Sequence, residues 1–363
     1  MRLVSLEFVR FLYDNKKSLP QDEVFYHHVL QDIEHDGIAS QVYFLLKQQG
    51  RLEQTPAFFQ CCLKEEYDKG LYQNLFIKNQ TDQLLRMFEE KKIDVIALKG
   101  VYFAEKYFCH LGARATSDID LLVKIQDLTI AIESVKSFGF TVEEEFIPGH
   151  FHCSFSKKLP GSPTPLVVEL HWDLVKKSTS RFNINDLWKQ SIPVSKSGYI
   201  KELSPLHTFY MICLHGWRHN LDSMKYFIDI IQVIDKERKE IDFDQFIQLA
   251  ESHQTLKRNI RTLSIVYQQF PHLDKVKMFP FKVNNTLWEY QSVKGFRLYW
   301  DFLDYQFFSY DTVKHTLIEI GNWLWPSKYE VSSQIDEQSQ GKKMYLLLYK
   351  KRLTSLLKAV LPH

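Results

Sequence analysis

Two acidic residues in the stretch RATSDIDLLV are the most informative chemical feature of this 363-residue sequence. The alternation of apolar residues predicts a strand, so Asp118 and Asp120 project from one face while Ile119 points into the core. Two neighbouring carboxylates repel each other unless a cation lies between them. Mg²⁺ prefers oxygen ligands and commonly uses one or two carboxylates together with substrate phosphates. The spacing therefore predicts a metal site, although a lone Asp-x-Asp is more often surface charge or a turn.

The stretch VVELHW carries the second feature, an acidic residue inside an apolar strand. Glu169 stands among valine and leucine residues, and His171 shares its face of the strand. Because unpaired burial of a charge is costly, this glutamate is either paired or functional. On a strand next to that of Asp118 and Asp120, Glu169 would complete a cluster of three carboxylates.

The elements that must position these residues form three successive regions. Residues 1–92 have helical spacing and predict an N-terminal helical region. Within it, TPAFFQCCLKEEYDKG predicts a helix that Thr55 caps, with Pro56 in the first turn and a stop at Gly70.

Residues 93–202 hold the short strand-like segments IDVIALKG, SDIDLLVKI, FTVEEEF, HFHCSFS, PLVVELHW and, more weakly, GYIKEL. Helical periodicity returns over residues 203–363 and predicts a C-terminal helical domain. The predicted fold class is therefore α+β, with a small mixed-sheet core between two helical regions.

ALKG, ARATSDIDLLV and VVELHW, in this order, resemble the uncharacterised nucleotidyltransferase family of the DNA polymerase β-like superfamily. The His pair in HFHCSF, and LHGWRHN followed by YFIDIIQVI, add weaker matches, so that the resemblance covers residues 35–235 approximately. It implies a nucleotidyltransferase core at 93–202. It also implies an enzyme that moves a nucleoside monophosphate from a nucleoside triphosphate, such as ATP, to a hydroxyl-type acceptor, with release of pyrophosphate. The acceptor, whether small molecule, peptide or protein, stays open.

The resemblance assigns roles to the three carboxylates. Asp118 and Asp120 would hold one or two Mg²⁺ (or Mn²⁺) ions that bridge the triphosphate. Glu169 would hold the second ion or take the proton from the attacking hydroxyl. Two such ions stabilise both the entering and the leaving oxygen of an in-line displacement.

The resemblance also implies a nucleotide-binding set around the Lys-Gly turn. Gly100 opens a helix whose backbone N–H groups would face phosphate oxygens. Lys99 and Arg114 are the nearest basic residues for neutralising the triphosphate, and Ser117 would donate a hydrogen bond to it.

Three histidines suggest a different chemistry. His150 and His152 alternate on one strand face, and with His171 and Glu169 they could form a Zn²⁺ site of a hydrolase. That reading leaves the two aspartates unexplained. We therefore favour histidines that line the acceptor pocket or hydrogen-bond to the carboxylates.

The helical segment LHGWRHNLDSMKYFIDII offers accessory candidates. His215 and Arg218 fall within one turn of helix, and Asp229 lies on the next predicted helix. One interpretation is a polar network between the helices, with Asp229 bonded to His215 or Arg218. The other is a pair of helices that closes over the nucleotide, with Arg218 near phosphate or base.

The C-terminal segment KKMYLLLYKKRLTSLLKAVL combines an apolar stripe with positive charge. The stripe comprises Leu346, Tyr349, Leu353, Leu356, Leu357 and Val360, and the basic residues are Lys342, Lys343, Lys350, Lys351, Arg352 and Lys358. Docking of the stripe on the body of the protein is the favoured prediction. A peripheral contact with an anionic membrane or an acidic partner is the alternative.

Composition excludes several classes of protein. Hydrophobic residues make up 45% and charged residues 25%, which argues against disorder and low complexity. The formal net charge of +2 argues against a dedicated nucleic-acid binder. No apolar stretch is long enough to span a bilayer, and five cysteines without CxxC spacing indicate free thiols. We therefore expect a cytoplasmic protein. A non-catalytic nucleotide- or partner-binding module of the same fold remains the alternative to an enzyme.

Overall fold

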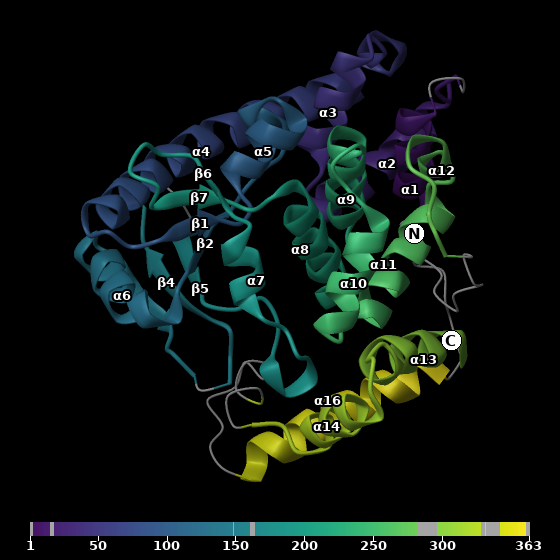
Figure 1. The fold of residues 1–363 in the computed structure, drawn as a ribbon. Helices are drawn as coiled ribbons and strands as arrows, with labels where there is room; N and C mark the ends of the chain where they lie inside the picture. Colours follow the sequence, from purple (N-terminus) through teal and green to yellow (C-terminus); the bar gives the residue numbers. More distant parts are fainter. Residues whose placement is uncertain are drawn as a thin grey trace.

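The computed structural model describes residues 3–14, 18–147, 149–159, 164–281, 296–327, 331 and 342–360 (Figure 1). One mixed seven-stranded sheet lies among helices that come from both ends of the chain. The predicted α+β fold class is therefore confirmed. The five cysteines are all free, as their spacing indicates. In the described ranges, no helix combines the length and the apolar character that crossing a membrane requires.

The sheet brings the two acidic strands together. Its strands, in the spatial order β3-β4-β5-β2-β1-β7-β6, are β1 (Val95–Ala97), β2 (Asp118–Val123), β3 (Thr141–Glu144), β4 (His152–Lys157), β5 (Leu166–His171), β6 (Ile192–Pro193) and β7 (Ile200–Glu202). Strand β2 is antiparallel to β1 on one side and parallel to β5 on the other. Strand β4 covers the far edge of β5 in antiparallel register.

The two faces of the sheet have different roles. Helices α4 (Ala57–Glu90) and α6 (Leu128–Ser137) cover one face, where Ile119 and Leu121 of β2 belong to an apolar core (Figure 1). Because side chains alternate along a strand, Asp118 and Asp120 project from the opposite face. Helices α8 (Pro205–Arg218) and α9 (Met224–Glu237) lie on that side. The alternation thus separates a dry core from a polar site.

The predicted helix end at Gly70 is wrong, because α4 continues through Gly70 to Glu90. A Cβ atom on Gly70 would lie 2.9 Å from Ser40 Oγ, so the glycine serves close packing of α4 against α3 (Ala39–Gln48) and does not end the helix. The predicted cap is also wrong, since α4 begins at Ala57 and the Thr55 hydroxyl donates instead to the Leu52 carbonyl. Tertiary packing thus overrides the local stop signal.

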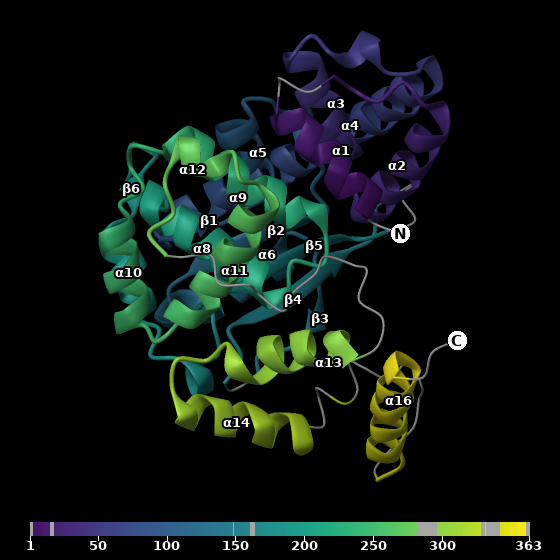
Figure 2. The same cartoon turned by 90° about the vertical axis from the view of Figure 1, so that its right-hand side faces the viewer.

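The other helices complete the layers around the sheet. They are α1 (Leu3–Tyr13), α2 (Glu23–Asp36), α5 (Val101–Phe108), α7 (Ile184–Lys189), α10 (Phe243–Ser252), α11 (Leu256–Gln269), α12 (Leu273–Val276), α13 (Phe296–Leu303), α14 (Val313–Leu324) and α16 (Lys342–Val360). Short 3₁₀ turns lie at Leu52–Gln54, Leu111–Ala113, Ile125–Asp127 and Lys177–Thr179, and a π turn lies at Asp304–Phe308. Helices α13, α14 and α16 lie together at one end of the molecule (Figure 2).

The C-terminal helix α16 does not dock as predicted. Leu346 and Leu353 of the apolar stripe are 69% and 58% exposed, whereas Leu348, which lies off that stripe, is 1% exposed. Helix α16 contacts α13, so a different face is buried. The side chains of Leu356, Leu357 and Val360 lie outside the described residues.

Candidate active site

Three carboxylates meet where β2 and β5 run side by side. In the parallel register Asp120 lies opposite Glu169, and Asp118 lies opposite Val167. The structure therefore brings together the three acidic residues that the sequence singles out, on the face turned toward α8 and α9. No feature within either strand alone produces this cluster; it depends on the pairing of segments about 50 residues apart.

Asp120 is the most enclosed of the three carboxylates and has the most partners. Its side chain lies 3.0 Å from Lys99 Nζ and 3.2 Å from His171 Nε2, and that nitrogen is also 3.1 Å from Glu169. Burial alone would raise the pKa of Asp120, but Lys99 and His171 hold it well below its usual range. The two carboxylates in turn raise the pKa of His171 against the effect of its burial. Asp120 is thus ionised, and a shared imidazole links it to Glu169.

Asp118 is the least compensated carboxylate. Burial and the neighbouring Asp120 raise its pKa, and Lys99 and Lys225 offset this only in part. Across the described ranges its side chain forms no hydrogen bond or ion pair. A negative charge in this position calls for a cation.

The donor set fits a divalent cation. Ligand atoms of Asp120, Glu169 and His171 lie within 4.8 Å of one another. Asp118 lies outside this group but lines the same cavity, so the acidic residues of the site outnumber the histidine and suit Mg²⁺ or Mn²⁺. Neither His150 nor His152 belongs to this convergent group in the described part of the chain.

The Lys99-Gly100 turn lies directly against the acidic strand. Gly100 precedes α5 with φ of +74°, and a Cβ atom there would lie 3.5 Å from the Asp118 carbonyl oxygen. That distance is ordinary van der Waals contact, but a side chain at this position would strain the backbone because of its positive φ. The glycine therefore allows the amino end of α5 to approach the carboxylates.

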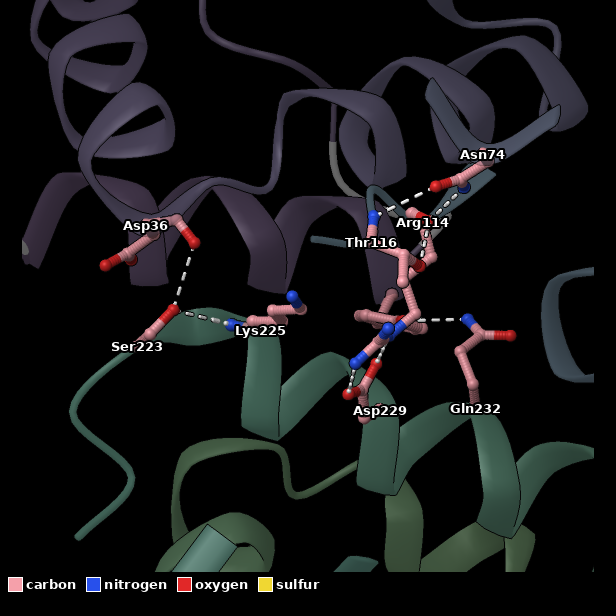
Figure 3. A network of polar contacts seen from close by, with 9 residues as sticks. Asp36, Asn74, Arg114, Thr116, Ser223, Lys225, Asp229 and Gln232 are labelled. Atoms are coloured by element: carbon pink, nitrogen blue, oxygen red, sulfur yellow. Dashed lines mark hydrogen bonds and ion pairs between the residues drawn. The ribbon is translucent and has the colours of Figure 1, made fainter. Parts of the chain in front are cut away.

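Arg114 and Asp229 form a buried ion pair that joins the core to α9 (Figure 3). Arg114 Nε and Nη2 each lie 2.8 Å from a carboxylate oxygen of Asp229, across 115 residues of sequence. The interpretation that Asp229 bonds to His215 or Arg218 is therefore wrong. Arg218 instead lies 3.4 Å from His215 Nδ1. The Arg114 guanidinium lines the cavity, but Asp229 already matches its charge.

Helix α4 fixes the loop that leads into β2. Asn74 Nδ2 donates to the carbonyls of Leu111 and Arg114, and Asn74 Oδ1 accepts from Thr116 N–H (Figure 3). The start of α9 is held in the same way, since Ser223 donates to the Asp36 carbonyl and accepts from the backbone N–H of Lys225. The N-terminal helices thus position both sides of the site.

A cavity of about 550 Å³ opens over the carboxylates. Of the predicted site residues it is lined by Lys99, Gly100, Arg114, Ser117, Asp118, Asp120, His150, His152, Glu169, His215 and Arg218. Asp229 and His171 are not among its lining residues: Asp229 pairs with Arg114, and His171 contacts Asp120 and Glu169. Five lysine and arginine side chains line the cavity against three carboxylates. Such a charge distribution suits a polyanion bound together with a cation.

Three imidazoles that line the cavity, those of His152, His215 and His219, are neutral at physiological pH. Burial and His171 lower the pKa of His152 to about 4, and burial and Arg218 lower that of His219 to about 4. Burial and Lys99 hold the pKa of His215 well below its usual range. These rings therefore add hydrogen-bonding groups without adding charge.

Sequence reasoning missed Lys225, the most informative basic residue of the cavity. It lies in the first turn of α9 beside Ser117 and Asp118, and burial and Arg114 lower its pKa to about 8. Lys176, Phe151 and Tyr226 line the cavity as well and were not predicted. A lysine in an amphipathic helix is typical of a solvated face, so the sequence carries no local signal for it.

The chain belongs to the uncharacterised nucleotidyltransferase family, whose model matches residues 23–271. The matched segment includes the whole sheet, the carboxylate cluster and helices α8 and α9. The resemblance inferred from the sequence motifs is thereby confirmed. Comparisons with curated proteins and with solved structures give no significant match.

Proposed function

We propose that this protein is a metal-dependent nucleotidyltransferase that moves a nucleoside monophosphate from a nucleoside triphosphate to a hydroxyl-type acceptor, with release of pyrophosphate. The observation that carries this proposal is the β2–β5 register, which sets Asp118, Asp120 and Glu169 on the floor of a basic cavity. Membership of a nucleotidyltransferase family supports it.

The carboxylate cluster would hold Mg²⁺ or Mn²⁺. Asp118 supports this assignment best, because its half-buried charge forms no ion pair or hydrogen bond with the described side chains. When bound, the ion supplies charge neutralisation at the oxygens of the reacting phosphate. In its absence Lys99 and His171 supply the compensation around Asp120.

The basic residues would bind and orient the triphosphate. Lys99 and Lys225 lie on either side of Asp118, one at the turn before α5 and the other on α9. Arg218 approaches from the carboxyl end of α8 and stacks over the Phe151 ring at 4.9 Å. Arg114 contributes mainly by fixing α9, because Asp229 already matches its charge.

Glu169 and His171 would handle the proton of the acceptor hydroxyl. Burial alone would raise the pKa of Glu169, but His171 lowers it, so the carboxylate is ionised and able to accept a proton. Because His171 Nε2 also bonds to Asp120, it holds Glu169 in a fixed orientation toward the cavity.

A titration of nonhydrolysable nucleoside triphosphates with Mg²⁺ tests the proposal. We expect the wild type to bind, and the Asp118→Ala/Asp120→Ala variant to bind at least about tenfold more weakly. Lys78→Ala, which removes a cation that pairs with Glu105 outside the cavity, serves as the matched control. Equal affinity of the wild type and the double variant would count against the site.

Turnover separates an enzyme from a binding module. Incubation of candidate acceptors with each of the four ribonucleoside triphosphates should give an acceptor whose mass rises by one nucleoside monophosphate. Nucleotide affinity without pyrophosphate release from any mixture would favour the non-catalytic alternative. Tightly bound zinc in the purified protein would favour the histidine-based hydrolase instead.

A further inference from the structure

A second, smaller cavity of about 230 Å³ adjoins the first. It lies between α8, α11, α14 and the turn at Lys177–Thr179. Phe151, Lys176 and Arg218 line both cavities, so the stacked Phe151–Arg218 pair forms the partition between them. A molecule that extends from the smaller cavity to the carboxylates would therefore pass these shared residues.

The unusual group in the smaller cavity is the guanidinium of Arg258. Its side chain is completely buried, yet Nε and Nη1 have no hydrogen-bond partner. Nη2 alone donates, to the Thr179 carbonyl. The plane is held between the rings of Trp217 at 4.6 Å and Tyr310 at 4.5 Å. The Arg258 guanidinium is thus a buried cation on the cavity lining, and two of its three nitrogens donate no hydrogen bond within the described chain.

Two other buried arginines show what Arg258 lacks. Arg114 is matched by Asp229, and Arg261, one turn along α11 from Arg258, pairs with Asp301 and Asp304. Within the described ranges Arg258 forms no ion pair with any carboxylate. Burial lowers its pKa, and the charges of Asp311 and Glu319, which form no ion pair with it among the described residues, offset this only in part. Breaking or omitting one partner of a buried ion pair is costly, so the position calls for an anion from outside the chain.

A phosphate or a carboxylate matches this guanidinium in size and geometry. A carboxylate is planar and a phosphate is tetrahedral, but each offers two oxygens to a bidentate N–H fork, and both fit the volume of the cavity. Tyr310 and Gln306 lie on the same lining and present polar side chains beside the guanidinium. Glu319 also lines the cavity, and Gln306 donates to it at 2.8 Å.

We propose that this cavity is the acceptor subsite and that Arg258 binds an anionic group, a phosphate or a carboxylate, carried by the acceptor. The anion-binding role stands on the cavity alone, whereas the role as acceptor site rests on the proposed function. The acceptor is then a hydroxylated molecule with an acidic group at one end. Its hydroxyl extends past Phe151 and Arg218 to Glu169.

Calorimetric titration of the full chain with inorganic phosphate, and separately with acetate, tests the anion site. The protein is first saturated with Mg²⁺ and a nonhydrolysable nucleoside triphosphate, so that the larger cavity is filled. We expect one of the two anions to bind the wild type, and Arg258→Gln to weaken that binding at least about tenfold. The preferred anion identifies the acidic group of the acceptor.

Three further variants make the outcome decisive. Arg261→Gln removes a paired arginine of the same helix and should leave anion binding unchanged. Gln306→Glu adds a carboxylate to the lining without touching Arg258, so it should block the anion even if Arg258→Gln does not fold. In the Asp118→Ala/Asp120→Ala background, where the larger cavity stays open, Arg258→Gln should still weaken anion binding at least about tenfold, which separates this site from the nucleotide site.

Failure of both anions to bind the wild type would overturn the inference, and so would equal binding by the wild type, Arg258→Gln and Gln306→Glu. Anion binding that persists while the wild type binds no nucleotide would refute the proposed function and leave the anion site standing.

Discussion

Replacement of Lys225 by methionine should stabilise the protein and weaken nucleotide binding at the same time. The pKa of Lys225 lies at about 8, against 10.5 for a lysine in water, because burial and Arg114 disfavour its charge. At about 1.4 kcal/mol for each pH unit, this difference corresponds to about 3 kcal/mol of destabilisation by the charged form at pH 7. Methionine keeps the length of the side chain and removes that charge. The free energy of unfolding of the nucleotide-free protein should therefore rise by up to about 3 kcal/mol.

The same substitution should weaken binding of a nucleoside triphosphate by at least about tenfold, because a charge-assisted hydrogen bond to phosphate is lost. Urea denaturation measures the first effect and calorimetry the second. Lys236→Met on the same helix is the matched control, since Lys236 is exposed and lies away from the cavity. It should change neither quantity.

The pH dependence provides an independent check. The unfolded chain binds the Lys225 proton more tightly than the folded chain does, so wild-type stability should rise between about pH 8 and pH 10.5 from this group. Lys225→Met should lack that rise. Nucleotide affinity should fall as pH rises through about 8, and binding at pH 8 should take up about half a proton. A Lys225→Met protein that is less stable than the wild type, or that binds nucleotide equally well, would refute the reasoning.

Three further sets of variants test the site and its scaffold. Arg114→Leu or Asp229→Leu alone should lower the free energy of unfolding by about 3–5 kcal/mol in urea denaturation, because each change leaves a buried charge unpaired. The double variant should lose much less than the sum of the two single losses. Additive losses would contradict this reasoning. Asp118→Asn should raise the midpoint of thermal unfolding at pH 7, since burial and Asp120 raise the pKa of this carboxyl and its charged form is destabilising there; a lower midpoint would show that the charge is already compensated. Gly70→Ala should destabilise the protein by about 1–3 kcal/mol through the contact with Ser40 Oγ, and the loss should shrink in a Ser40→Ala background; an equal loss in both backgrounds would place the strain elsewhere.

The strands and the carboxylate cluster could be predicted from the sequence, because both depend on patterns of period two. Acidic residues that interrupt an apolar strand are visible in the sequence itself, as Asp118, Asp120 and Glu169 show. Once β2 and β5 pair in parallel, the three carboxylates project from the same face of the sheet, because side chains alternate along each strand.

Features that depend on distant packing could not be predicted. The partner of Arg114 lies 115 residues away, and nothing near Asp229 indicates which of several basic residues it meets. Gly70 resembles a helix stop in its local sequence, but its role is to leave room for the Ser40 side chain packed against α4. The charge of Arg258 is informative because it is buried, and that of Lys225 because it faces the cavity, and both are properties of the folded chain.

Electron paramagnetic resonance of Mn²⁺ tests most directly whether the three carboxylates hold a divalent ion together with a triphosphate. Free Mn²⁺ gives a strong signal that is lost on binding, so the bound fraction can be measured with a nonhydrolysable nucleoside triphosphate present at a fixed concentration. We predict that wild-type protein removes Mn²⁺ from the free and nucleotide-only pools, and that Asp118→Asn/Asp120→Asn, which keeps the shape of both side chains, does not. Equal binding of Mn²⁺ by the two proteins would contradict the assignment of the β2–β5 carboxylates as the metal site.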